Sequence, residues 1–516
     1  MTSLSEQVAY LRLSPLTPIH VGTGDTLDPL SYVMREDDGV PRLYPIDLPA
    51  WVEAHENPAE LARFFATKEL PEIRRRVAKE LDPLIFGGAP ATVHSREIYE
   101  KYAHELGAKD SRNQLLIDPA IANGRTGALI VPGSSIKGAI RTAVIDWIDR
   151  EWGMDLKAAS DSEKNGQRGA YNKKLEEFLG KISVNAFKNL KVGDFQAPLG
   201  DSLFVTANEV RIRPKDKPPT PKHDCQVTLS LAMTGKTYAL YGKVMLGSHD
   251  ARGRDAALTV AHDSRRQSWS LVELMALCRS FYEWRYNQEK QNFYSKPHLS
   301  ATAKALAPVD AAIAEMASDG MLVRIGHYSH VECMTVTGNK PQTRKAKDGG
   351  IIPFGVTRTL ADHTYPFGWA VLRQCSEEEY RAAEARREAH DAAFLRERQN
   401  KRQIILDQKA EEERTRGEEQ AREEEERLAR EAERAALEAM TPLERLVHLV
   451  ESDKAHENQA VDLFGMLQEM EADMRVRAAA ALKAYWVRGD KKWIKKECSK
   501  KQWEKVVEVK RILGES

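Results

Sequence analysis

"VPGSSIKGAIRTAV", residues 131–144, combines a sharp turn with the start of an amphipathic helix. A short apolar strand, "GALIVPG", ends at Gly133. Beyond the turn, Ile136, Ile140 and Val144 recur at four-residue spacing, which places them on one face of a helix. The stretch therefore predicts a strand, a tight turn and a helix whose apolar face joins a core.

The polar residues of the same stretch are typical of a phosphate site. A glycine turn that opens a helix presents free backbone amides and the positive end of the helix dipole. Ser134 or Ser135 is placed to cap the helix, and Lys137 and Arg141, four residues apart, share a face that can supply charge to a phosphate. The alternative is a capped helix whose lysine and arginine are simply solvated.

A nucleotide-binding loop does not fit this stretch. The usual pattern places a glycine, four residues and then glycine, lysine and serine or threonine. Gly133 is followed at that spacing by Gly138, but the next residue is Ala139 and Lys137 precedes the second glycine. The match to a nucleotide-binding loop therefore fails, which disfavours an ATPase or GTPase and leaves open a nucleic-acid phosphate or a solvated helix.

Length and composition predict a multidomain protein outside the membrane. At 516 residues the chain exceeds one ordinary core, and no run approaches the ~18 apolar residues of a membrane helix. The start "MTSLSEQVAYLRL" lacks the pattern of a secretory signal, which predicts a cytoplasmic protein. The five cysteines lie far apart without paired spacing, so we expect no metal, no cofactor and no disulfide framework.

The net charge of zero hides an uneven distribution. Residues 1–100 carry about six more acids than bases, and residues 101–375 carry about ten more bases than acids. A basic segment of this kind permits a nucleic-acid partner but is also an ordinary feature of a solvated surface.

Catalytic patterns are weak. His327 and His330 lie three residues apart in a loop without a nearby carboxylate cluster, so we expect backbone capping or RNA stacking rather than acid–base catalysis. Asp25 and Asp28 lie beside glycine and proline, which favours a turn-forming role over a catalytic one.

Composition divides the chain into four parts. Strand patterns alternate with helical ones up to Cys375, as in "VAYLRL", "QVTLSLAM" and "MLVRIGHYSHVE". From Glu377 nearly every position is charged or alanine, which predicts an exposed helix laced with ion pairs, either single or in a two-stranded coiled coil. Thr441 and Pro442 fit the N-cap and first residue of a helix that opens a small helical domain with a basic end.

Three stretches resemble the RAMP superfamily of CRISPR-associated proteins, and within it the fifth subunit of the type III-A (Csm) effector complex. They are "LSPLTPIHVGTGDTLDPLSYV" at 13–33, "VPGSSIKGAIRTAV" at 131–144 and "GVTRTLADHTYPFGWAVL" at 355–372. The resemblance implies an α+β fold with two ferredoxin-like (RRM-like) domains and glycine-rich loops, at 1–195 and 196–375. The charged helix, 376–440, and the helical C-terminal domain, 441–516, lie outside it.

The same resemblance implies a function and a set of RNA contacts. It implies a subunit that holds the 3′ part of the crRNA, is needed for crRNA maturation and has no nuclease activity of its own. Its implied partners are crRNA, the backbone RAMP subunit, the small helical subunit, a host nuclease and, indirectly, target RNA. The implied RNA-binding residues are His20, Gly22, Gly24, Gly133, Ser134, Ser135, Lys137, Gly138, Arg141, Arg358 and Thr359.

Two other functions stay open on the sequence. One is a RAMP endoribonuclease that processes precursor crRNA, for which His20, His327 or His330 would have to act as acid or base. The other is a scaffold, in which residues 376–516 recruit a further protein or RNA.

Overall fold

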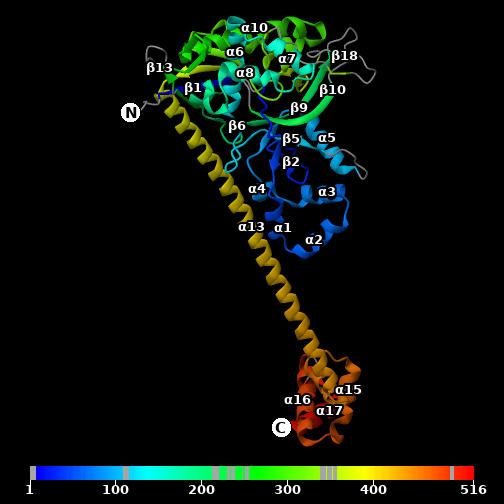
Figure 1. Ribbon diagram of the computed structural model, residues 1–516. Helices are drawn as coiled ribbons and strands as arrows, with labels where there is room; N and C mark the ends of the chain where they lie inside the picture. The colour runs from blue at the N-terminus through cyan, green and yellow to red at the C-terminus, as the bar shows by residue number, and fades with distance from the viewer. Residues whose placement is uncertain are drawn as a thin grey trace. The chain divides into compact units, whose positions relative to one another are not determined.

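The computed structural model describes most of the chain. The described residues are 7–108, 115–211, 220–228, 233, 239–246, 248–249, 255–337, 344–345, 351–352, 357–488 and 493–515. They form two compact units, Met1–Ile405 and Leu406–Ser516. Figure 1 follows the chain through both.

The first sheet of the first unit has five antiparallel strands. Their order across the sheet is β16 (Gly320–Arg324), β21 (Trp369–Cys375), β1 (Gln7–Pro15), β11 (Leu240–Leu246) and β7 (Leu190–Val192). Helix α6 (Gly133–Trp152) lies between β1 and β7 in the sequence, and α10 (Leu271–Glu289) lies between β11 and β16. Strands β21-β1-β11-β7 with these two helices follow the strand order of a ferredoxin-like fold.

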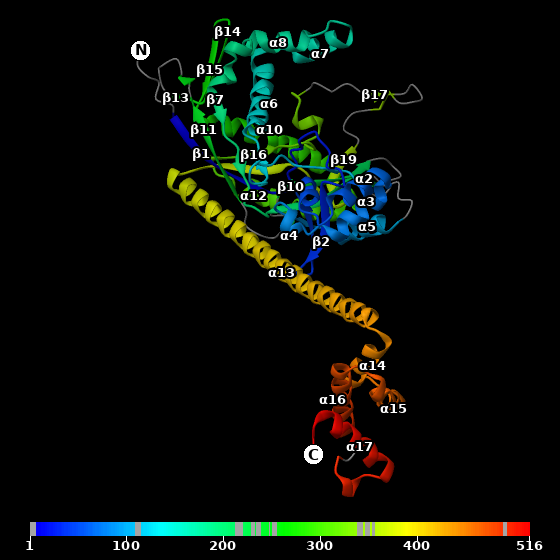
Figure 2. The ribbon, with the colours of Figure 1, turned by 90° about the horizontal axis from the view of Figure 1, so that it is seen from below.

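Strand β1 shows why the sheet forms where it does. Leu11 and Leu13 are fully buried in the main core, whereas Tyr10 and Arg12 alternate with them and are only partly buried. The main core also holds Ile136 of α6. In Figure 2, α6 and α10 lie side by side next to β7, β11 and β16.

The second sheet is longer and mixed. Its strands run in the order β2 (Tyr32–Asp37), β3 (Val40–Pro45), β4 (Ala91–Val93), β9 (Ser202–Arg211), β10 (Thr220–Thr228) and β5 (Ile117–Asp118), and β19 (Thr357–Ala361) pairs with β9 and with β20 (Tyr365–Pro366). Along β9, Leu203 and Val205 join the main core and Phe204 joins a smaller one. The ranges 1–195 and 196–375 both contribute strands to both sheets.

Short elements complete the first unit. The helices are α1 (Leu48–Glu53), α2 (Pro58–Thr67), α3 (Leu70–Glu80), α4 (Pro83–Phe86), α5 (Arg96–Gly107), α7 (Leu156–Lys164), α8 (Ala170–Leu179), α11 (Ser300–Ala305) and α12 (Ala307–Ala314). The strands are β6 (Ile130–Val131), β8 (Phe195–Gln196), β12 (Ser248–His249), β13 (Asp255–Ala256), β14 (Leu258–His262), β15 (Arg265–Trp269), β17 (Arg344–Lys345) and β18 (Ile351–Ile352).

The structure confirms the α+β class and most of the predicted elements. The strand predicted at "VAYLRL" is β1, and the helix predicted after Gly133 is α6. Residues 58–80 form two helices and not one, because Lys68 is extended and a new helix begins at Leu70 with Pro71 in its first turn. Part of "QVTLSLAM" lies outside the described residues, as does most of the basic loop that begins at Thr337.

The long charged helix is α13, Glu377–Ala439. It is laced with ion pairs three or four residues apart, such as Arg427 with Glu424 and Arg434 with Glu438. Its buried residues are Ala383 and Asp391. The exposed, ion-paired helix is therefore confirmed, and pairing into a coiled coil stays a prediction.

The second unit contains a small helical domain with its own core. Its helices are α14 (Pro442–Glu451), α15 (Glu457–Met466), α16 (Ala472–Arg488) and α17 (Lys500–Leu513). Val447, Leu463 and Leu482 are among its fully buried residues. Thr441 caps α14 and Glu444 completes a capping box, as the sequence predicts for this position.

In the described parts of the chain, helices with the length and apolar character of a membrane span are absent. The same residues contain no cluster of three or more His, Cys, Asp or Glu side chains arranged to hold a metal ion.

Candidate nucleic-acid interface

A cavity of about 460 Å³ opens where α6 meets the loops that follow β1 and β16. Tyr282 of α10 closes part of its wall. The lining residues are Val21, Gly22, Ser135, Gly138, Ala139, Arg141, Thr142, Tyr282, Arg324, Ile325, Gly326, His327, Ser329, Cys333 and Met334. The described residues that line it include arginines and a histidine but neither Asp nor Glu, so the cavity favours an anion.

Helix α6 presents a polar face to this cavity. Ser135, Gly138, Arg141 and Thr142 follow one another at helical spacing, which brings them to the same side of the helix. Lys137 lies one turn before Arg141, outside the lining. Phosphates can therefore run along the side of α6.

Lys137 and Arg141 are partly buried cations that lack counterions. Neither side chain makes an ion pair or a side-chain hydrogen bond within the described part of the chain. Burial lowers the pKa of Lys137. Burial also lowers the pKa of Arg141, and this effect exceeds the opposite effect of the nearby Tyr171. Partly desolvated cations without partners favour a bound anion, because an anion restores the interactions that burial removed.

The N-terminus of α6 is arranged differently from the prediction. The N-cap is Pro132, and Ser134 and Ser135 lie inside the first turn, so neither serine caps the helix. Instead, the backbone N–H of Gly133 donates to Oδ1 of Asp194 at 2.8 Å. The capping prediction is wrong because a carboxylate from the β7–β8 connection satisfies this amide and faces the positive end of the dipole.

The two glycines of α6 have different surroundings. A Cβ on Gly133 would lie 2.0 Å from the carbonyl oxygen of Val192, so this glycine is required for α6 to pack against β7. A Cβ on Gly138 would meet no atom within 4 Å. Close packing against β7 therefore explains why residue 133 is a glycine, whereas Gly138 is unobstructed and lines the cavity.

The loop after β1 lies on the other side of the cavity. Gly22 is part of the lining, and the His20 ring lies behind it, almost fully buried. The His20 ring stacks on Tyr328 at 5.7 Å between centroids and lies 6.3 Å from the exposed His327 ring. The backbone N–H of His327 donates to the carbonyl of His20 at 2.7 Å, which ties the two loops together.

The structure thus brings four of the predicted contacts, Gly22, Ser135, Gly138 and Arg141, into one lining. His20, Gly133, Ser134 and Lys137 neighbour it through the same loop and helix. Gly24 lies outside the lining, in an exposed turn with a φ of 86°.

Arg358 and Thr359 are not brought to the cavity. Both are buried, and the Arg358 guanidinium donates to Glu289 at 2.5 Å and to Glu332 at 3.1 Å. Glu289 also accepts from Arg324 at 2.6 Å. Burial alone would raise the pKa of Glu289, but the two guanidinium groups hold it at about 2. This buried cluster supports the cavity wall through Arg324, and RNA contacts by Arg358 and Thr359 stay predictions.

Sequence reasoning also missed lining residues. Arg324, Tyr282 and Ser329 carry no motif, although a lone arginine inside the apolar run "MLVRI" is a signal that its charge has a buried partner. The turn-forming role expected of Asp28 is confirmed, because its Oδ1 accepts from the N–H of Leu30 at 2.8 Å.

The role expected of the loop histidines is confirmed at one of them. Nε2 of His330 accepts a long hydrogen bond, 3.5 Å, from the backbone N–H of Thr359. His330 therefore bonds to the backbone of β19 and, unlike His327, is not among the residues that line the cavity.

The part of the chain that contains α6 matches a known protein family. Residues 12–224 match the RAMP superfamily. The RAMP match includes the loop after β1 and all of α6, and it ends before β16 and the cluster around Glu289. No curated protein matches the chain.

Two solved structures align with about 70% of the chain. One is a chain of a cryo-EM structure of a Csm–crRNA–target RNA ternary complex, with a TM-score of 0.47, 17% identity, and coverage of 71% of this chain and 100% of that one. Another is the crystal structure of T. onnurineus Csm5, with a TM-score of 0.38, 16% identity, and coverage of 70% and 99%.

Proposed function

We propose that this RAMP protein is a crRNA-binding structural subunit of a type III-A (Csm) effector complex, located at the crRNA 3′ end and needed for crRNA maturation. The observation that carries the proposal is the cavity beside α6, whose described lining has cations and open backbone but no carboxylate. Its partners in this proposal are the backbone RAMP subunit, the small helical subunit and a recruited host nuclease, with target RNA bound only indirectly.

The cavity suits recognition of an RNA backbone. Guide sequences vary, so a subunit that holds every guide must contact phosphates and 2′-hydroxyls rather than base edges. Ser135 and Thr142 offer hydroxyls for sugar and phosphate contacts, and Arg141 offers charge. Gly138 leaves room for a backbone to approach α6 closely.

Removal of the two partnerless cations tests the proposal. We expect Lys137→Ala with Arg141→Ala to weaken RNA binding equally across guide sequences and to reduce the slope of log K against log salt by about 1.4, at about 0.7 for each phosphate of a single strand that the protein no longer neutralises. The measurement is RNA binding at several salt concentrations, together with sequencing of RNA that co-purifies from cells carrying the neighbouring genes.

Lys157→Ala with Lys173→Ala provides the matched control, because it removes the same charge from exposed positions on α7 and α8 outside the lining. Repeat-derived RNAs that are absent, or shortened at their 3′ ends, only in the cavity variant support the proposal. A decrease that depends on guide sequence, or that the control shares, contradicts it.

One observation favours a second candidate, an endoribonuclease. The His20 and His327 rings lie 6.3 Å apart, and His327 is exposed and lines the cavity. Cleavage of precursor crRNA in the presence of EDTA that disappears in His327→Ala would establish this activity. Binding without cleavage by the purified chain is the result that our proposal predicts.

A further inference from the structure

The outer face of the first sheet carries aromatic and basic side chains on its two central strands. Tyr10 of β1 is paired with Lys243 of β11, and Arg12 is paired with Tyr241. Strand alternation places these four side chains on the face opposite Leu11 and the main core. RRM-type sheets stack the bases of single-stranded RNA on aromatic side chains of such a face, with cations nearby.

The first turns of α13 cover this face. The Tyr380 ring lies 4.9 Å from the Tyr10 ring, and Nζ of Lys243 lies 5.0 Å from the centre of Tyr380. Glu379 accepts a hydrogen bond from the Tyr241 hydroxyl at 3.2 Å and lies 3.5 Å from the Arg12 guanidinium. One aromatic ring and one carboxylate of α13 thus contact the tyrosines and cations of this face.

We propose that this face is a second site for single-stranded RNA, and that residues 377–391 of α13 occupy it in cis as a built-in competitor. Each partner of α13 on the sheet is a group that single-stranded RNA also uses: a tyrosine ring for stacking, an arginine and a lysine for phosphate, and a phenolic hydroxyl for hydrogen bonding. The site is separate from the cavity beside α6, since none of these residues lines that cavity.

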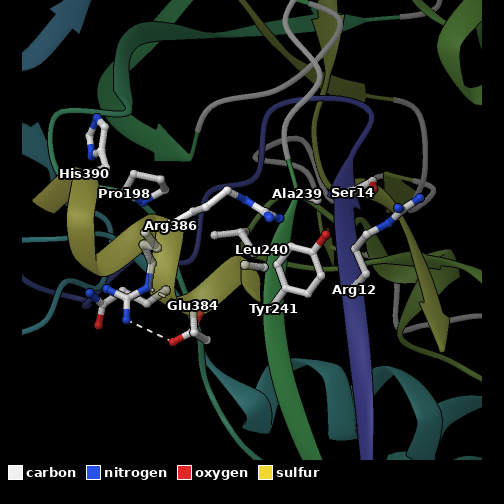
Figure 3. A pocket seen from close by; sticks show the side chains of 12 residues that line it. Arg12, Ser14, Pro198, Ala239, Leu240, Tyr241, Glu384, Arg386 and His390 are labelled. Carbon is white, nitrogen blue, oxygen red and sulfur yellow. Dashed lines mark hydrogen bonds and ion pairs between the residues drawn. The ribbon is translucent and has the colours of Figure 1, made fainter. Parts of the chain in front are cut away.

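A groove beside the covered face leaves part of the site open. Its volume is about 380 Å³, and it lies between α13 and strands β1 and β11. Figure 3 shows Tyr241 between Arg12 and Arg386. Glu384 and Arg387, which also line the groove, form an ion pair. The remaining lining residues are Ser14, Gln196, Pro198, Ala239, Leu240, Ala383 and His390.

Arg386 is the group that a strand would meet first in this groove. Its side chain is exposed and makes no ion pair or hydrogen bond with another described residue, whereas Arg387 is held by Glu384 at 2.9 Å and by Asp391 at 2.8 Å. A phosphate bound by Arg386 and Arg12 would compete directly with Glu379 for Arg12.

The helix is anchored beyond the covering turns. Oδ1 of Asp391 accepts from the backbone N–H of Leu199 at 2.8 Å, and the guanidinium of Arg398 donates to the carbonyl of Gly87 at 3.0 Å. Substitutions at Glu379 and Tyr380 therefore weaken the cover without removing these anchors.

The test measures RNA binding by the full chain after the cover is weakened. The variant is Glu379→Ala with Tyr380→Ala, made both in the native sequence and together with Lys137→Ala and Arg141→Ala. The probe is a fluorescent oligouridylate of about ten nucleotides, a length that fills one binding fold. We expect affinity to rise about tenfold in both backgrounds, as removal of an internal competitor requires.

Two further variants assign the gain to this face. Adding Tyr10→Ala and Lys243→Glu should abolish it, because these substitutions remove the stacking ring and the cation. Glu378→Ala is the matched control, since it removes the same charge from an exposed neighbouring position of α13. Circular dichroism verifies that each variant, including the single variant Tyr380→Ala, keeps its fold.

A folded double variant without a gain overturns the proposal, as does a gain that Glu378→Ala shares or that persists after Tyr10 and Lys243 are replaced. RNA binding at the cavity beside α6 is tested separately. There, the measurement is the decrease in RNA affinity when Lys137 and Arg141 are replaced in the otherwise native chain. Failure of one site is therefore distinguishable from failure of the other.

Discussion

Replacement of Gly138 by alanine should stabilise the free protein and weaken its RNA complex. A glycine inside a helix costs ~0.5–1 kcal/mol relative to alanine, because the unfolded chain loses more conformational freedom. At Gly138 the added Cβ meets no atom within 4 Å, so no clash offsets this gain. We therefore expect the free energy of opening of α6 to rise by ~0.5–1 kcal/mol.

The same methyl group should obstruct a strand that runs along α6. It would project from the face that Ser135 and Arg141 share, where the cavity lies. We expect RNA affinity to fall about tenfold, or by ~1.4 kcal/mol. Native-state hydrogen exchange of the α6 amides measures the stability, and titration with crRNA measures the affinity.

Gly417→Ala is the control, because this glycine also lies inside a helix, α13, in open surroundings and outside the cavity. Unchanged RNA affinity in a stabilised Gly138→Ala protein would refute the placement of RNA against this face. A destabilised Gly138→Ala protein would refute the inference that the position is open.

Two further substitutions test the supports of the cavity. Asp194→Ala removes the carboxylate that caps Gly133, so α6 should lose ~1 kcal/mol of stability in urea unfolding. RNA affinity should hold or rise, because a negative charge is removed, and a fall in affinity would contradict this role. Glu289→Gln leaves Arg324 buried without a carboxylate partner and Arg358 with Glu332 alone, and should cost ~3–5 kcal/mol, measured by the same unfolding. Because the pKa of Glu289 is depressed from 4.5 to about 2, its stabilising effect is full above pH 4.5 and is lost as the pH falls through about 2. Stability titrated across that range should fall less steeply in Glu289→Gln, and an equal slope would contradict the assignment.

Local patterns in the sequence predicted the elements well because local physics determines them. The spacing of Ile136, Ile140 and Val144 follows the helix period, and all three are buried in α6. The charged run after Glu377 forms an ion-paired helix because its neighbours three and four residues apart are its partners. Thr441 likewise caps its own helix.

The contacts that local patterns did not predict depend on distant partners. Asp194 takes the place predicted for a serine cap, although it lies 61 residues beyond Gly133 in the chain. The predicted RNA ligand Arg358 is held inside by Glu289, 69 residues away. Sequence spacing cannot predict contacts between residues this far apart in the chain, because only the folded sheets bring them together. The family resemblance pointed to α6 but could not say which of its groups already have partners within the fold.

The order of strands in the first sheet has a consequence for how the protein is made. Its central strand, β1, is flanked by β11 and β21, and β21 ends only at Cys375. A ribosome must therefore deliver most of the first unit before this sheet can close, and early strands wait with unpaired edges. At about 5–20 residues per second, residues 376–391 follow within about one to three seconds. The outer face of the newly formed sheet is thus exposed for only a short time before α13 covers it.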